Sequence, residues 1–135
     1  ANFVLYCFRG FVYYHLGKYK EAIKDFKNVI YLIKESFIPK LIPNLKISRI
    51  RTDKEVLFIL EDLKFYHFNN NSRLVDYLGA VTFSEDLTCS DVVNLFDLEF
   101  SFEIYHELNF LINQISKHLK IKKVNSDRKA INYYV

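Results

Sequence analysis

Residues that break helices are scarce in this sequence. Among its 135 residues are three Gly and two Pro, whereas 50% are hydrophobic and 17% are aromatic. A many-stranded sandwich or barrel needs frequent turn formers, so this scarcity argues against one. Long periodic runs with few breaks favour helices instead. The composition therefore predicts an all-α chain, and its length predicts a single domain over 1–135.

Methionine is absent, and the sequence begins at Ala1. We therefore expect a piece of a longer protein, or one trimmed at its start. The two cysteines, Cys7 and Cys89, lie far apart and form no CxxC pair, so nothing indicates a disulfide framework or a zinc site. Reduced thiols and the lack of a signal-peptide layout predict a cytoplasmic protein. No apolar run reaches 18 residues, so no membrane span is expected.

Signatures of catalysis are also missing. His106-Glu107 has no second His at the spacing of a metalloprotease helix, and no GxGxxG, GKS/GKT or GxSxG stretch occurs. The adjacent carboxylates of Glu61-Asp62 diverge on a helix rather than converge. We therefore expect a protein that is not an enzyme and has neither a metal nor a cofactor.

Two helices, over about 2–16 and 20–35, open the chain. Gly17 stands where the first should end, because glycine accepts the left-handed cap conformation. So short a turn makes the two helices antiparallel. Gly10 and Ala22 are small, which lets the two backbones approach closely.

The segment 3–36 resembles a tetratricopeptide repeat, a helix-turn-helix unit of about 34 residues. The matching positions are Tyr6, Gly10, Tyr13, Leu16, Gly17, Tyr19, Ala22 and Phe26. The family has Leu where this chain has Arg9, a small Ala at Val29 and a closing Pro at Lys34. The missing proline predicts that the second helix is longer than usual.

The stretch 37–68 is interpreted as a degenerate repeat. One repeat period places Val56, Leu60 and Leu63 in phase with the first unit, and Thr52 is a predicted N-cap with Glu55 in a capping box. Pro39 and Pro43 precede this helix, so a first helix here should start late or kink.

The remainder has a loop region at 69–89 and a long helix at 90–122. A short strand at 80–83 is an alternative within the loop region. Apolar residues recur every three or four positions throughout 90–122. Acidic residues occur near the start of this stretch and basic residues near its end, which suits the helix dipole. The tail 123–135 either forms a short final helix or frays. The predicted fold is an all-α, repeat-like superhelix of antiparallel hairpins with a long C-terminal helix.

The resemblance implies that partners bind the first helix, which lines a groove in this family. The groove residues would be Val4, Cys7, Phe8, Phe11, Tyr14 and His15. Cys7 and Phe11 stand where some members carry a carboxylate-gripping Lys and Asn, which argues against a co-chaperone-type adaptor. The aromatic face is either an anchor for a hydrophobic peptide or helix, or is buried by another helix of this chain.

Charge is unevenly spread: residues 1–55 sum to +6, residues 84–116 to −7 and residues 117–135 to +5. Such blocks are typical of solvated faces. A basic patch around the Pro-containing stretch comprises Lys40, Lys46, Arg49, Arg51 and Lys54. An RNA-associated subunit using this 40–54 stretch is therefore an alternative function, although no nucleic-acid motif accompanies it.

The function that the resemblance implies is a non-enzymatic scaffold or adaptor, a subunit of a larger assembly with protein partners. A homo-oligomer is compatible with the sequence. A single repeat cannot bury its own faces, so downstream helices or a partner must cover it.

Overall fold

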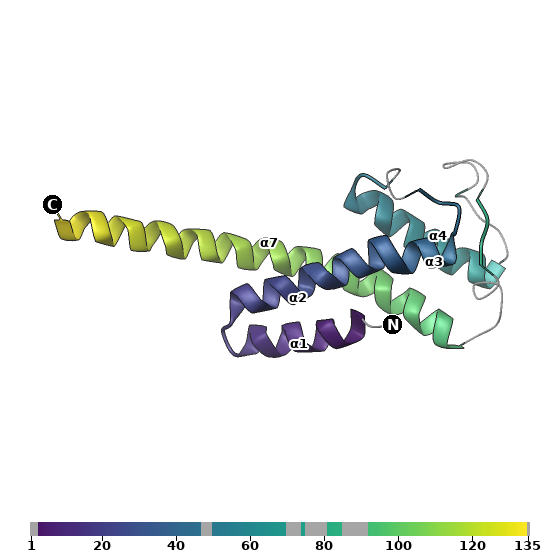
Figure 1. Ribbon diagram of the computed structural model, residues 1–135, viewed down its shortest axis with the longest axis horizontal. Coiled ribbons are helices and arrows are strands. Elements are labelled where there is room, and N and C mark those ends of the chain that lie inside the picture. The colour runs from purple at the N-terminus through teal and green to yellow at the C-terminus, as the bar shows by residue number, and fades with distance from the viewer. Residues whose placement is uncertain (1–2, 47–49, 70–73, 75–80, 85–91, 135) are drawn as a thin grey trace.

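The computed structural model describes residues 3–46, 50–69, 74, 81–84 and 92–134, with the backbone alone described at 67–69, 92–96, 121 and 123–134. Every regular element in this part of the chain is helical, which confirms the predicted all-α fold (Figure 1). The elements in chain order are α1 (Phe3–His15), α2 (Tyr19–Leu32), the π-helical turn η1 (Ile33–Phe37), α3 (Ile38–Leu41), α4 (Asp53–Asn69) and α7 (Val92–Tyr134).

The turn between α1 and α2 forms because Gly17 accepts a positive φ of 75°. The Lys18 amide donates to the Tyr13 carbonyl at 2.9 Å, and the Gly17 amide donates to the Tyr14 carbonyl at 3.1 Å. This pair of bonds is a Schellman motif, which satisfies carbonyls at the end of α1. The predicted cap at Gly17 and the antiparallel hairpin are both confirmed.

Gly10 lets α1 approach α2 closely. A Cβ atom added at Gly10 would lie 2.5 Å from the Phe26 Cε1 atom and 3.3 Å from the Asp25 Cβ atom. Phe26 is fully buried, and its ring also meets the Phe11 ring edge-on at 5.1 Å. The absence of a side chain at Gly10 therefore makes the space that the Phe26 ring fills.

The second arm of the hairpin continues well past α2. Residues 19–41 form one rod of α2, η1 and α3, which confirms that the second helix is longer than usual (Figure 1). Pro39 has no N–H to donate within this rod, and the widened turn of η1 lies directly before it, where the Ile38 amide bonds to the Ile33 carbonyl. Ile42 leaves helical geometry at φ −128° and ψ 81°, as expected for a residue that precedes proline.

The stretch 37–68 does not fold as a second hairpin in its described residues. Pro43 follows the end of the rod, and no helix lies between it and α4 among residues 42–46 and 50–52. In its described residues this stretch supplies α3, which continues the rod, and α4, the expected second helix. The strand considered at 80–83 is not seen at 81–83, and residue 80 lies outside the described residues.

Helix α4 begins after its predicted N-cap, Thr52, which bonds to Glu55 of the first helical turn. The Glu55 amide donates to Thr52 Oγ1 at 3.2 Å, and the Thr52 hydroxyl donates to the Glu55 carboxylate at 3.2 Å. The in-phase residues Val56, Leu60 and Leu63 are all fully buried. The phase predicted for α4 is therefore confirmed, although its partner helix is α7.

Helix α7 has 43 residues and packs against α4 and α2. Leu98, Tyr105 and Leu108 bury one side of it, against α4 and the α2 rod. The boundary expected near 122 is not observed, because the helix continues through the residues expected to form a separate tail. No Gly or Pro occurs in residues 92–134 to interrupt it. Its C-terminal part extends beyond the other helices (Figure 1).

Candidate functional site

The side of α1 that faces α7 belongs to the core. Phe3 is buried, stacks on Phe100 of α7 at 5.9 Å and meets Phe37 edge-on at 5.7 Å. Cys7 is also buried, and this burial, aided by the negative charge of Glu107, raises the pKa of its thiol to about 11. The neutral thiol therefore acts here as a small apolar group rather than a nucleophile.

The predicted groove residues do not form one continuous surface. Cys7 is buried, and three others are half-buried against the core, namely Val4, Phe11 and Tyr14. Phe8 and His15 are exposed. The two interpretations of the aromatic face, an anchor for a partner and part of the core, thus apply to different residues. A binding role for any of them stays a prediction.

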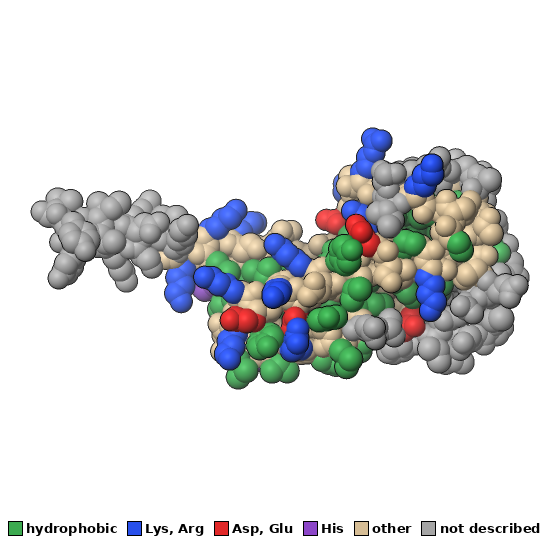
Figure 2. Space-filling model, in the orientation of Figure 1, with side chains coloured by type: hydrophobic (Ala, Val, Ile, Leu, Met, Phe, Trp, Pro, Cys, Tyr) green, Lys and Arg blue, Asp and Glu red, His purple; other side chains and the backbone are tan. Residues whose placement is uncertain are grey.

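The exposed side of α1 carries an apolar row, here called the outer stripe. Its members Leu5, Phe8, Val12 and Leu16 are 72%, 64%, 56% and 65% exposed. Their spacing of three, four and four residues places them along one face of the helix. In Figure 2, hydrophobic side chains gather along the edge of the molecule that α1 forms. Sequence reasoning identified Phe8 but missed the other three.

A cleft lies beside the outer stripe, between α1 and α2. It has a volume of about 420 Å³ and is lined by Leu5, Tyr6, Arg9 and Leu32. Leu5 thus belongs to both features, so the stripe and the cleft form one continuous surface.

Arg9 explains one departure from the family pattern. Its guanidinium donates two hydrogen bonds to the carboxylate of Asp25 on α2, from Nε to Oδ2 at 2.8 Å and from Nη2 to Oδ1 at 2.7 Å. The Asp25 side chain is 3% exposed, so the buried carboxylate needs this partner. The hydrogen bond and the charge of Asp25 raise the pKa of Arg9 above its ordinary value. A leucine at position 9 would leave Asp25 without this partner.

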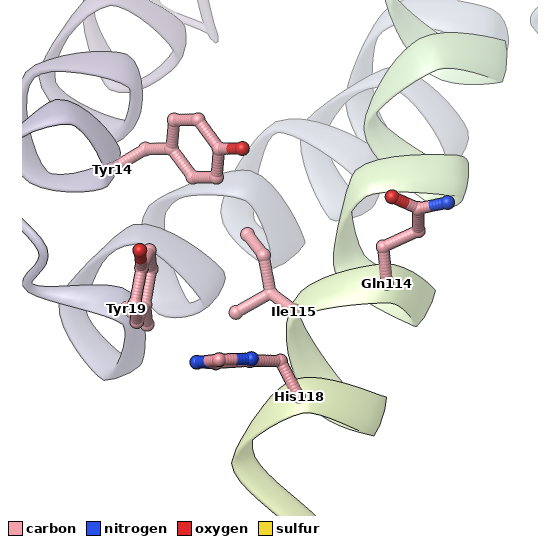
Figure 3. Close-up of a pocket in the computed structure, with 5 residues that line it drawn as sticks. All are labelled: Tyr14, Tyr19, Gln114, Ile115 and His118. Atoms are coloured by element: carbon pink, nitrogen blue, oxygen red, sulfur yellow. The ribbon is translucent and has the colours of Figure 1, made fainter.

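A smaller hollow lies where the hairpin turn meets α7. This junction pocket has a volume of about 210 Å³, and its lining residues are Tyr14, Tyr19, Gln114, Ile115 and His118 (Figure 3). The Tyr19 ring meets the His118 ring edge-on at 5.6 Å and the Tyr14 ring at 5.8 Å. Of this set, Tyr14 is the residue that the sequence predicted for a binding groove. The other four lie on α2 and α7, and only the fold brings them beside Tyr14.

The predicted basic patch is spread over separate segments. Lys40 belongs to α3, Lys46 and Arg51 lie in the connection before α4, and Lys54 is in the first turn of α4. All four are exposed, and Arg49 lies outside the described residues. The RNA-associated alternative stays a prediction.

Among the described residues, no three His, Cys, Asp or Glu side chains gather in a way that would hold a metal ion. Within the same residues, no helix combines the length and the apolar character needed to cross a bilayer.

Comparison with known protein families gives a match over the N-terminal hairpin. Residues 3–35 match the family model described as the tetratricopeptide repeat. Neither the curated proteins nor the solved structures contain a match to this chain. The matched residues are those of the α1–α2 hairpin with its Gly17 cap and its close approach at Gly10. Sequence and geometry agree, and the N-terminal hairpin of this chain is a tetratricopeptide repeat.

Proposed function

We propose that this chain is a protein-interaction subunit that docks an amphipathic helix of a partner on the outer stripe. Tetratricopeptide repeats are typically non-catalytic interaction modules, which supports binding rather than catalysis. The observation that carries the proposal is the stripe itself, because four large apolar side chains of α1 and the turn that follows it are more than half exposed.

The spacing of the stripe favours a helical partner. Side chains three and four residues apart form ridges on a helix, and a second helix packs its own ridges between them. The adjacent cleft of about 420 Å³ offers room for one large apolar side chain of that partner.

The positive charge of the hairpin indicates a second property of the partner, namely acidic residues beside its apolar stripe. The hairpin that carries the stripe, residues 3–32, contains five basic and two acidic residues, and Arg9 at the edge of the cleft is paired with one of those acids, Asp25. Acidic residues beside the apolar stripe of the partner would complement this side. The expected ligand is therefore an amphipathic helix with an acidic border.

Crosslinking from single positions tests this proposal. A photo-crosslinking amino acid at Phe8 or Val12 should capture a partner in the source cell. The same group at Tyr31, which is 58% exposed on α2, is the matched control and should not.

The captured partner is then purified and titrated against the chain. Phe8→Asp and Val12→Asp should each weaken binding by about tenfold or more, whereas Tyr31→Asp should leave the Kd within about twofold. Circular dichroism checks that each variant stays helical. Equal binding by wild type and both stripe variants would show that the partner docks elsewhere.

A further inference from the structure

The side of α7 turned away from the core carries an ordered set of charges around one aromatic residue. At 100° per residue, one face of the helix contains Glu99, Glu103, His106, Phe110, Asn113 and Lys117. All six are exposed, and the opposite face holds the buried Leu98, Tyr105, Leu108 and Ile115.

Phe110 is the centre of this face. It is 59% exposed, more than any other large apolar residue of α7 whose side chain is described. Glu103 lies seven residues before it and Lys117 seven residues after it, which is two helical turns or about 10 Å in each direction. Neither Glu103 nor Lys117 forms an ion pair with another described residue.

Such a face is complementary to itself when it is turned end to end. A two-fold axis through Phe110 brings each Phe110 against its copy, and it places Glu103 of each chain opposite Lys117 of the other. In an isologous interface every contact occurs twice, so one design satisfies both charge pairs.

We propose that a second copy of this chain docks antiparallel on this face of α7, with Phe110 at the two-fold axis. The face from Glu99 to Lys117 is about 27 Å long, enough for a helix pair with several layers of contacts. The proposal does not depend on the proposed function, because the outer stripe lies on α1 and takes a different partner.

The charge pattern selects the antiparallel arrangement. Within α7, residues 92–116 contain four acidic and no basic residues, whereas residues 117–134 contain six basic and one acidic. A parallel pair would set acidic segment against acidic segment and basic against basic. An antiparallel pair sets opposite charges together along the helix, which favours that orientation and weakens as salt rises.

Sedimentation equilibrium on the 135-residue chain tests the proposal. The wild type should show a reversible monomer–dimer equilibrium at concentrations up to about 100 μM. Phe110→Asp should raise the dimer Kd by about tenfold or more, because it sets two carboxylates together at the axis. These residues are exposed, and circular dichroism checks that the variants remain helical.

Charge exchange separates this interface from other modes of association. Glu103→Lys alone and Lys117→Glu alone should each weaken self-association, since each creates like-charge pairs across the axis. An equimolar mixture of these two variants should form a mixed dimer, because every charge pair is then opposite in sign. The double variant Glu103→Lys/Lys117→Glu should dimerise as the wild type does.

Lys24→Glu is the matched control for Lys117→Glu. It makes the same change in net charge at an exposed residue, but it lies on α2 and outside the proposed interface. Its dimer Kd should stay within about twofold of the wild type. A monomeric wild type over this concentration range overturns the proposal. So does a dimer whose Kd is the same in Phe110→Asp, or a mixture of the single variants that stays monomeric.

Discussion

Replacing Gly10 with alanine is expected to destabilise this protein, against the usual rule for helix interiors. Alanine is favoured over glycine within a helix by about 1 kcal/mol. Here the new Cβ atom would lie 2.5 Å from Cε1 and 2.7 Å from Cδ1 of the Phe26 ring. That ring is fully buried and also meets Phe11, so it cannot turn aside freely.

The expected magnitude follows from these two opposed effects. Inserting a methyl group into a packed core costs roughly 1–3 kcal/mol, which exceeds the gain in helix propensity. We therefore expect Gly10→Ala to lower the free energy of unfolding by about 1 kcal/mol, and Gly10→Val to lower it further. Urea unfolding followed by circular dichroism at 222 nm measures both values.

A double-mutant cycle identifies the cause. Phe26→Leu opens space opposite Gly10, so adding Gly10→Ala to Phe26→Leu should cost less than it costs in the wild type. A Gly10→Ala variant more stable than the wild type would refute the reasoning. Equal costs in the two backgrounds would show that the Phe26 ring is not the obstacle.

The remaining predictions concern the turn, one hydrogen bond and one thiol. Gly17→Ala meets no atom within 4 Å but keeps a φ of 75°, so strain alone should lower the free energy of unfolding by about 1 kcal/mol in urea unfolding. Tyr105→Phe removes the 2.6 Å bond from the Tyr105 hydroxyl to Asp53 Oδ1, and the same assay should show a loss of about 1–2 kcal/mol. The pKa of the Cys7 thiol is about 11 in the fold and 9.0 in its ordinary state, so the folded chain holds this proton longer. The stabilisation that comes from burying the neutral Cys7 thiol is therefore full below pH 9 and is lost as the pH rises towards 11. Urea unfolding midpoints of the wild type and of Cys7→Ala, measured at about pH 8 and about pH 10, would detect this loss.

Local features were predictable because their causes lie within a few residues of one another. The cap at Gly17 needs one residue that accepts a positive φ, and the start of α4 needs Thr52 and Glu55 three residues apart. Each of these signals can be read from a window shorter than two helical turns.

The exposed side of α1 was not predictable in the same way. This helix is apolar nearly all round, so its pattern does not show which side is buried. Which side is covered depends on α7, about ninety residues later, because Phe3 packs on Phe100. The sequence therefore indicated an apolar first helix but left open which of its residues belong to the core and which lie outside.

Helix α7 is so long that its C-terminal part extends past the helices that stabilise the rest of it (Figure 1). Isolated helices of fewer than about 12–15 residues are marginal in water, and most helices in proteins are stabilised by packing. Yet the C-terminal part of α7 extends past the other helices, and Leu119 is its last residue described as half-buried on the core (Figure 1). In an antiparallel pair centred on Phe110, residues 120–128 would run beside residues 92–100 of the second copy. The proposed dimer would thus place the basic end of each α7 along an acidic helical segment, and it would set a second helix beside the extended part.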